Sequence, residues 1–205
     1  MEQALPLITI MGPTGVGKTE LAIALSKAIS SEIISVDSVQ VYKGMDIGSG
    51  KPSNDILDRH PHKLVGFIDP WKSYSTALFI LDATREINLC DRSNKVPLLV
   101  GGTMLYFRSL LSGISRMPEA NQDIRNEISA QAKKYGWGFL HKELNDIDPE
   151  SAKRIHPNDS QRIQRALEVY RVSSQTMTEW RKRDKGSDLL KSKKVMQFAV
   201  EPKSR

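Results

Sequence analysis

Short apolar runs rich in branched residues recur along the first half of the chain, and amphipathic stretches separate them. Runs of this length predict buried strands, and apolar residues repeating every three or four positions predict helices. Strands are expected at 5–11, 32–36, 63–68 and 96–100. Helices are expected at 19–29, 74–89 and 104–111. This alternation predicts an α/β fold, in which a parallel sheet is covered by helices on both faces.

Two connections in this half carry local signals. Either Ser73 or Ser75 is expected to cap the helix over 74–89, since serine readily accepts a hydrogen bond from a first-turn N–H. Residues 41–52 hold three glycines and a proline, which indicates an ordered loop rather than a linker.

The pattern changes after Pro118, where only helical spacing recurs. Helices are expected over 124–135, around 140–144, from Pro149 and over 160–172, and Gly136 is expected to end the first of them. On the helix over 160–172, Ile163, Leu167 and Tyr170 are expected to face inward, and Arg162, Arg165 and Glu168 outward. Thr176 to Glu179 has the spacing of a capping box. Residues 195–200 return to strand-like composition.

These changes in pattern divide the chain into three parts. We expect a core over 1–117, an all-helical insertion over 118–194 and a return strand to the core within 195–205. A chain of 205 residues suits one mid-sized domain with a smaller insert.

Composition excludes a membrane protein. Hydrophobic residues make up 39% of the chain, but the longest apolar runs are far too short to cross a bilayer. The N-terminus has no signal-peptide pattern. The single cysteine, Cys90, cannot form an internal disulfide, and no neighbouring Cys or His suggests a metal site. We therefore expect a cytoplasmic protein, and a monomer.

The net charge of +6 comes from the end of the chain. Lys and Arg number 12 against 11 Asp and Glu in residues 1–117, 9 against 10 in 118–180, and 9 against 3 in 181–205. The basic residues gather at 181–183 and 191–194. Such a stretch attracts a phosphate backbone, but a solvated loop can carry the same charge. Charge alone favours neither interpretation.

Residues 12–19, GPTGVGKT, match the phosphate-binding loop pattern at every fixed position, between an expected strand and an expected helix. Backbone N–H groups and the helix N-terminus would face the anion. Lys18 would reach the terminal phosphates, and the Thr19 hydroxyl is placed to ligate Mg²⁺. The predicted phosphate-binding residues are Gly12, Pro13, Thr14, Gly15, Val16, Gly17, Lys18 and Thr19.

The loop does not say which phosphorylated molecule it holds. ATP-using loops usually pair with an apolar strand that ends in a metal-holding Asp. Here the strand over 96–100 ends in Gly-Gly-Thr, and Asp69 is only an ordinary match. Asp37 follows the second strand, at the sheet edge where ligands bind. It could accept a proton from a nucleophile or simply cap a turn.

Five segments, in this order and spacing, resemble the tRNA dimethylallyltransferase family (tRNA isopentenylpyrophosphate transferases). They are GPTGVGKTELA, SVDSVQVYKGMDIGSGKP, VPLLVGGTMLYFRSLLSG, RIHPNDSQRIQRALEVY and MQFAVEP. The resemblance implies a P-loop NTPase-like sheet with an all-α insertion. It also implies transfer of a dimethylallyl group from dimethylallyl diphosphate to the N6 amine of the adenosine 3′ of the tRNA anticodon, with Mg²⁺ as cofactor. The loop would then hold a diphosphate that departs.

The resemblance also assigns roles to residues. Asp37 would take a proton from the amine, Lys18 would stabilise the leaving diphosphate, and Thr103 would lie beside the reacting groups, although a helix cap also explains a Thr there. Contacts with the anticodon stem-loop, from which the target base is flipped, would come from Asp37, Ser38, Val39, Gln40, Thr103, Arg125, Gln161, Arg162, Ile163, Gln164 and Arg165.

The chain departs from the family at several positions and in its length. Gly15-Val16 stands where the family usually has Ala-Ser. Family members also continue well beyond the final VEPKSR with further helices and a basic motif, so the resemblance implies a chain shortened at its C-terminus. Two other functions stay open: an ATP-dependent small-molecule kinase on the same fold, and a tRNA-binding fragment without catalysis.

Overall fold

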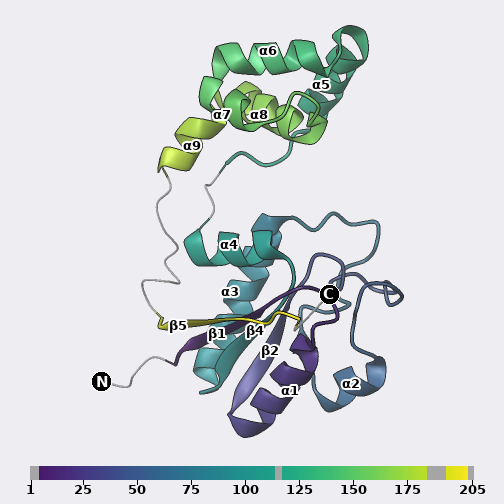
Figure 1. Cartoon of the computed structure of the whole chain (residues 1–205), viewed down its shortest axis with the longest axis vertical. Coiled ribbons are helices and arrows are strands. Elements are labelled where there is room, and N and C mark those ends of the chain that lie inside the picture. The colour runs from purple at the N-terminus through teal and green to yellow at the C-terminus, as the bar shows by residue number, and fades with distance from the viewer. Residues whose placement is uncertain (1–4, 114–116, 184–192, 203–205) are drawn as a thin grey trace. The chain divides into compact units, whose positions relative to one another are not determined.

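The computed structural model describes residues 5–113, 117–183 and 193–202, and the chain divides into two compact units (Figure 1). The first unit comprises residues 1–113 and 186–205, and the second comprises residues 114–185. The helical insertion expected over 118–194 overlaps the second unit. Residues 184–192, near its expected end, lie outside the described ranges.

The first unit is built on a five-stranded sheet in which every pairing is parallel. The spatial order is β3-β2-β4-β1-β5. The strands are β1 (Leu7–Met11), β2 (Ser31–Val36), β3 (His62–Lys63), β4 (Val96–Gly101) and β5 (Val195–Ala199). The central strands are continuous apolar runs because helices cover both of their faces. The predicted α/β fold class is confirmed.

Alternate residues of β1, β2 and β4 enter two separate cores. Ile8, Ile10 and Ile33 pack with Ala22 of α1 (Lys18–Ala28), whereas Leu7, Ile34 and Leu99 face the opposite side. There they pack against α3 (Thr76–Arg92) and α4 (Met104–Ser112). The two-residue period of the strands therefore produces the helix–sheet–helix layering.

The segment between β2 and α3 differs from expectation. The helix α2 (Asn54–Arg59) was not predicted, although Ser53 caps it by accepting from the Ile56 N–H. The strand predicted over 63–68 is wrong beyond Lys63, because Leu64 and Gly66 adopt left-handed φ angles of 62° and 60°. The N–H groups of Phe67 and Ile68 then donate to the Val41 carbonyl instead of continuing the ladder.

The second unit contains, in its described part, only helices. They are α5 (Gln122–Tyr135), α6 (Trp137–Ile147), α7 (Pro149–Arg154), α8 (Ser160–Ser173) and α9 (Met177–Arg183). Ile128, Leu140, Leu144, Ile163 and Leu167 are fully buried in its core. Gly136, at φ 84°, ends α5 as predicted.

The predicted capping box also forms: the Thr176 N–H donates to the Glu179 carboxylate, and the Glu179 N–H donates to the Thr176 hydroxyl. No described helix has the length and apolar character needed to cross a membrane.

Candidate functional site

The loop between β1 and α1 turns on two glycines in left-handed conformation. Gly15 has φ 81° and Gly17 has φ 88°, a region that residues with a Cβ rarely adopt. Gly17 is the N-cap of α1 and offers no side chain to the first N–H groups of the helix. The positive end of the α1 dipole and its first N–H groups are therefore left for an anion.

The loop borders a cavity of about 280 Å³ at the carboxyl ends of the central strands. Ligands bind at this edge in open α/β sheets. The loop, α1, β2, β3, β4 and the glycine-rich segment over 37–53 between β2 and α2 contribute the lining residues. They are Thr14, Gly15, Gly17, Lys18, Thr19, Glu20, Ser35, Asp37, Gln40, Gly50, Pro52, His62, Val100, Gly101 and Gly102.

Gly101 allows β2 and β4 to approach closely at this cavity. A Cβ built on Gly101 would lie 2.0 Å from the Val36 carbonyl oxygen, a distance that no side chain can accept. The sequence shows the glycine but not this reason for it.

Lys18 lies at the start of α1 and lines the cavity. Its ammonium donates to the Pro13 carbonyl of the same loop at 2.5 Å. Burial lowers the pKa of Lys18 below its ordinary value, and the negative charge of Asp37 opposes that effect in part. The two charges are thus close enough to interact within one cavity.

Asp37 both caps a turn and lines the cavity. Its Oδ1 accepts from the backbone N–H groups of Val39 at 2.8 Å and Gln40 at 3.1 Å. The two sequence interpretations of Asp37, turn cap and cavity carboxylate, are therefore compatible. The two bonds fix the carboxylate relative to the end of β2.

Thr103 occupies the N-cap position of α4, but its hydroxyl does not cap that helix. The Thr103 Oγ1 instead accepts from the Ser38 N–H at 3.1 Å and lies 3.4 Å from the Ser38 Oγ. Thr103, Ser38 and the 43% exposed Val39 are next to the cavity without lining it. The structure thus brings Thr103 to the residue that follows Asp37.

The amide of Gln40 holds the glycine-rich segment beside the cavity. Its Nε2 donates to the carbonyls of Ser49 and Gly50 at 3.3 and 3.0 Å, and its Oε1 accepts from Ser35 at 3.3 Å. Gln40 was predicted to contact tRNA, but its side-chain amide is used within the protein.

His62 lines the cavity although its sequence position gave no sign of a role. Its Nδ1 lies 2.6 Å from the His60 carbonyl oxygen, and its buried Nε2 has no hydrogen-bond partner within the described residues. Burial lowers the pKa of His62, so the ring stays neutral at pH 7. Its strand is two residues long, too short for a periodic pattern to single it out.

Asp69, the alternative metal-holding residue, does not line the cavity. It pairs with Lys43 at 2.8 Å and with Lys72 at 3.1 Å, and these hydrogen bonds lower its pKa. Within the described part of the chain, no three His, Cys, Asp or Glu side chains gather as a metal cluster. The cavity beside the phosphate loop does offer oxygen atoms, among them those of Thr19 and Asp37.

The basic residues near the C-terminus that the structure describes include two engaged in ion pairs. Lys193 donates to Asp91 at 2.5 Å and to the Leu5 carbonyl at 3.3 Å, and Lys182 pairs with Glu150 at 2.9 Å. Lys185 and Lys191 lie within 184–192, outside the described residues.

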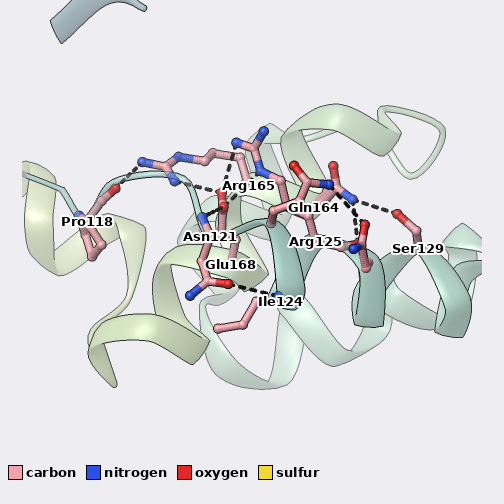
Figure 2. A network of polar contacts seen from close by, with 10 residues as sticks. Pro118, Asn121, Ile124, Arg125, Ser129, Gln164, Arg165 and Glu168 are labelled. Carbon is pink, nitrogen blue, oxygen red and sulfur yellow. Dashed lines mark hydrogen bonds and ion pairs between the residues drawn. The ribbon is translucent and has the colours of Figure 1, made fainter. Parts of the chain in front are cut away.

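In the second unit, called the helical unit below, the predicted RNA-contacting residues differ from one another in exposure and in bonding partners. Gln161 and Arg162 are exposed, and Arg162 pairs with Asp159 at 3.2 Å. Ile163 is fully buried in the core, so its side chain cannot contact RNA, as the inward helical spacing already indicated. Arg125, Gln164 and Arg165 instead lie together between α5 and α8 (Figure 2).

Glu168 joins these arginines, and its predicted outward position is wrong. Its side chain is fully buried because the segment before α5 crosses over it. Its Oε1 accepts from the Asn121 N–H at 2.7 Å and from Arg125 Nε at 2.9 Å. Its Oε2 accepts from Arg125 Nη2 at 3.2 Å and from Arg165 Nη1 at 2.7 Å (Figure 2).

Three further bonds extend this network. Arg165 Nη2 donates to the Pro118 carbonyl at 2.7 Å, and Gln164 Nε2 donates to the Arg125 carbonyl and the Ser129 hydroxyl at 3.2 and 2.9 Å. Burial would raise the pKa of Glu168, but the hydrogen bonds from Arg125, Arg165 and Asn121 outweigh it and lower the pKa. Glu168 is therefore ionised at neutral pH.

The parallel sheet, glycine loop and uncapped helix N-terminus define a P-loop protein. The sequence model of the IPP transferase family matches residues 40–205, and that of the isopentenyl transferase family matches residues 5–61. Because the first match covers most of the chain, this chain belongs to the IPP transferase family.

Solved structures support the same family. A full-length tRNA isopentenylpyrophosphate transferase from Bacillus halodurans is 41% identical, covers 82% of this chain and has a TM-score of 0.53. A tRNA delta(2)-isopentenylpyrophosphate transferase from Staphylococcus epidermidis is 33% identical over 96% of this chain, with a TM-score of 0.55. A eukaryotic dimethylallyltransferase acting on tRNA is 27% identical over 96%, with a TM-score of 0.78. The chain spans 56%, 64% and 48% of their respective lengths.

Proposed function

We propose that this chain transfers a dimethylallyl group from dimethylallyl diphosphate to the N6 amine of the adenosine 3′ of the tRNA anticodon. One observation carries the proposal beyond family membership. The phosphate loop, Lys18 and the carboxylate of Asp37 line a single cavity, so an anion-binding site and a proton acceptor are adjacent. Phosphate transfer to a small molecule would not explain the helical unit with its arginines.

The loop and Lys18 would bind the diphosphate of the prenyl donor. Backbone N–H groups at the N-terminus of α1 and the ammonium of Lys18 stabilise negative charge on the oxygen that leaves. In the transfer, the bond between the first prenyl carbon and this oxygen breaks, and its electron pair departs with the diphosphate. A new bond forms from the adenine nitrogen to that carbon.

Asp37 would accept the proton that the amine loses. An exocyclic adenine amine is a weak nucleophile because its lone pair is drawn into the ring, so removal of its proton during attack assists the reaction. The bonds from Val39 and Gln40 occupy Oδ1 and fix the orientation of the carboxylate. Thr103 would act as a positioning residue through its bond to Ser38.

A Mg²⁺ ion suits the oxygen atoms that the cavity provides. Magnesium is usually held by one or two protein oxygens together with substrate phosphates and water. The Thr19 hydroxyl, which lines the cavity, would hold it together with the oxygens of the bound diphosphate. When bound, the ion would neutralise charge on the leaving diphosphate.

The helical unit would bind the anticodon stem-loop of tRNA. Arg125, Arg162 and Arg165 are partly or largely exposed at 35%, 73% and 31% of their side chains. Guanidinium groups suit phosphate oxygens through charge and paired N–H donors. The target base must leave the stack to reach a cavity of this kind.

The decisive experiment incubates the chain with dimethylallyl diphosphate, Mg²⁺ and bulk tRNA, followed by mass spectrometry of the digested nucleosides. Adenosine carrying a five-carbon group is the expected product. ATP turnover with an added acceptor and no modified adenosine would establish the kinase instead. Salt-sensitive tRNA binding with no product at high protein concentration would indicate a binding fragment.

Asp37→Asn tests the proposed base. The amide keeps an oxygen for the N–H groups of Val39 and Gln40 but cannot accept the proton, so the rate should fall on the order of 100-fold or more while tRNA binding is kept. Asp55→Asn, at an exposed pair with Arg59 on α2, is the matched control and should be neutral. Equal loss of binding and rate in Asp37→Asn would make Asp37 structural.

A further inference from the structure

We infer that Glu168 is a positioning residue for RNA recognition: its buried carboxylate orients Arg125 and Arg165 as one paired guanidinium site for a backbone phosphate. The inference rests on the proposed function, because the phosphate is taken to be that of tRNA. Neither the phosphate loop nor the proton acceptor takes part in this site, which belongs to the helical unit alone.

The geometry leaves donors available on both arginines. A guanidinium carries five N–H donors in a fixed plane. Arg125 uses two of them on Glu168, through Nε and Nη2, and Arg165 uses one on Glu168 and one on Pro118. The two side chains are 35% and 31% exposed, whereas Glu168 is fully buried. Glu168 therefore holds each arginine through hydrogen bonds (Figure 2), and part of each arginine side chain remains exposed to solvent.

The two arginines are also fixed to each other through α5 and α8. Both guanidinium groups bond to the Oε2 of Glu168, at 3.2 and 2.7 Å, so one oxygen atom sets their separation. Gln164 adds a second tie, since its amide bonds to the Arg125 carbonyl. A free arginine loses considerable rotamer entropy when it binds phosphate, and prior fixing reduces that cost.

Stability alone is a weak reason for this arrangement. A buried ion pair is often no more stabilising than an apolar residue of similar size, because its desolvation offsets the attraction. Glu168 replaces what could be an ordinary core residue of α8, next to the buried Leu167 and Val169. Two guanidinium groups on one carboxylate also leave one positive charge in excess, which suits an anion.

Glu168→Gln distinguishes positioning from simple charge balance. The change removes one negative charge beside two arginines. If Glu168 merely neutralises them, tRNA binding should tighten, and log K should fall more steeply with log salt. If it positions them, tRNA binding should weaken by about fivefold to tenfold despite the added positive charge. Binding is measured on the full chain by fluorescence anisotropy with labelled tRNA at several salt concentrations.

A double-mutant cycle tests whether Glu168 acts through the arginines. Arg165→Gln should weaken binding by itself, and adding Glu168→Gln should then cause a smaller loss than it does in the wild-type chain, because only Arg125 remains to be positioned. Additive losses would overturn the inference. Glu143→Gln is the matched control. Glu143 of α6 pairs at 2.8 Å with Arg171, which lies on α8 as Glu168 does, and it has no bond to Arg125 or Arg165. This variant should leave tRNA binding unchanged.

Folding is followed by circular dichroism, and Glu168→Asp covers the case in which Glu168→Gln does not fold. Aspartate keeps the charge but withdraws the carboxylate by one methylene. A positioning role therefore predicts weaker tRNA binding, whereas simple charge balance predicts unchanged tRNA binding. Unchanged or tighter binding in the folded variants would overturn the inference and leave the proposed function intact. A wild-type chain that forms no complex with tRNA would overturn both.

Discussion

The Thr103 hydroxyl accepts a hydrogen bond from the Ser38 backbone N–H at 3.1 Å, across 65 positions of sequence. The bond joins the residue after Asp37 to the N-cap residue of α4. The Thr103 N–H in turn donates to the Val36 carbonyl at 3.2 Å. Thr103, which follows β4, thus bonds to the residue before Asp37 and to the residue after it. These two bonds hold the end of β2 against the end of β4.

Thr103→Val should slow prenyl transfer by about tenfold with little change in stability. Valine is similar in shape but cannot accept from Ser38, whose exposed N–H can turn to water instead. The loss would come from a less well placed Asp37. Initial rates and thermal melts measure the two effects. Thr103→Ser, which keeps the hydroxyl, should restore most of the rate, and equal rates for Val and Thr would contradict the positioning role.

Under the proposed function, Lys18→Gln should reduce prenyl transfer on the order of 100-fold, because the variant would lose the positive charge assigned to stabilising the leaving diphosphate. Lys18 lines the cavity, and its one described bond is to the Pro13 carbonyl. Lys27→Gln, an exposed site in the last turn of the same helix, is the control. Steady-state kinetics with varied dimethylallyl diphosphate measure both. Similar effects at Lys18 and Lys27 would argue against a phosphate-binding role.

Gly101→Ala should destabilise the first unit by about 1–3 kcal/mol, as overpacked sites typically do. The added Cβ would lie 2.0 Å from the Val36 carbonyl oxygen, so β2 and β4 would have to separate. Gly138→Ala, in the first turn of α6, has no heavy atom within 4 Å and should instead stabilise by up to about 1 kcal/mol. Urea unfolding measures both, and the same sign of change would refute the steric argument.

The free energy of unfolding should fall as the pH drops below about 6.5. Burial lowers the pKa of His62 in the folded chain, so between the unfolded and folded pKa values only the unfolded chain takes up a proton there. The slope from this group cannot exceed about 1.4 kcal/mol per pH unit.

Urea unfolding between pH 7 and pH 5 measures the effect. His62→Asn keeps an N–H for the His60 carbonyl but does not titrate, so its slope should be shallower than that of the wild type. A His62→Asn slope equal to that of the wild type would show that His62 does not contribute.

Sequence patterns predicted those parts of the fold that depend on neighbouring residues. The apolar runs predicted β1, β2 and β4. The glycine loop with Lys18 and Thr19 could be recognised because its pattern consists of consecutive residues. Local caps were also predictable: Ser75, one of two candidates, accepts from the Leu78 N–H and caps α3.

Long-range contacts account for what the sequence could not predict. Glu168 has the helical spacing of a surface residue, but a segment 47 positions away folds over it and donates the Asn121 N–H. Residues 64–68 have strand-like composition, yet Leu64 turns into the left-handed region and Phe67 pairs with Val41 instead. His62 gains its place at the cavity only through a two-residue pairing with β2.

The bare N-terminus of α1 has a consequence for the lifetime of the protein. Gly17 gives that helix no side-chain acceptor, so an anion bound there completes the helix as well as occupying the site. Ligand and fold are then linked: each tenfold excess of anion over its Kd adds about 1.4 kcal/mol to the folded state. Resistance to proteolysis, and hence abundance, would rise and fall with the supply of the diphosphate donor.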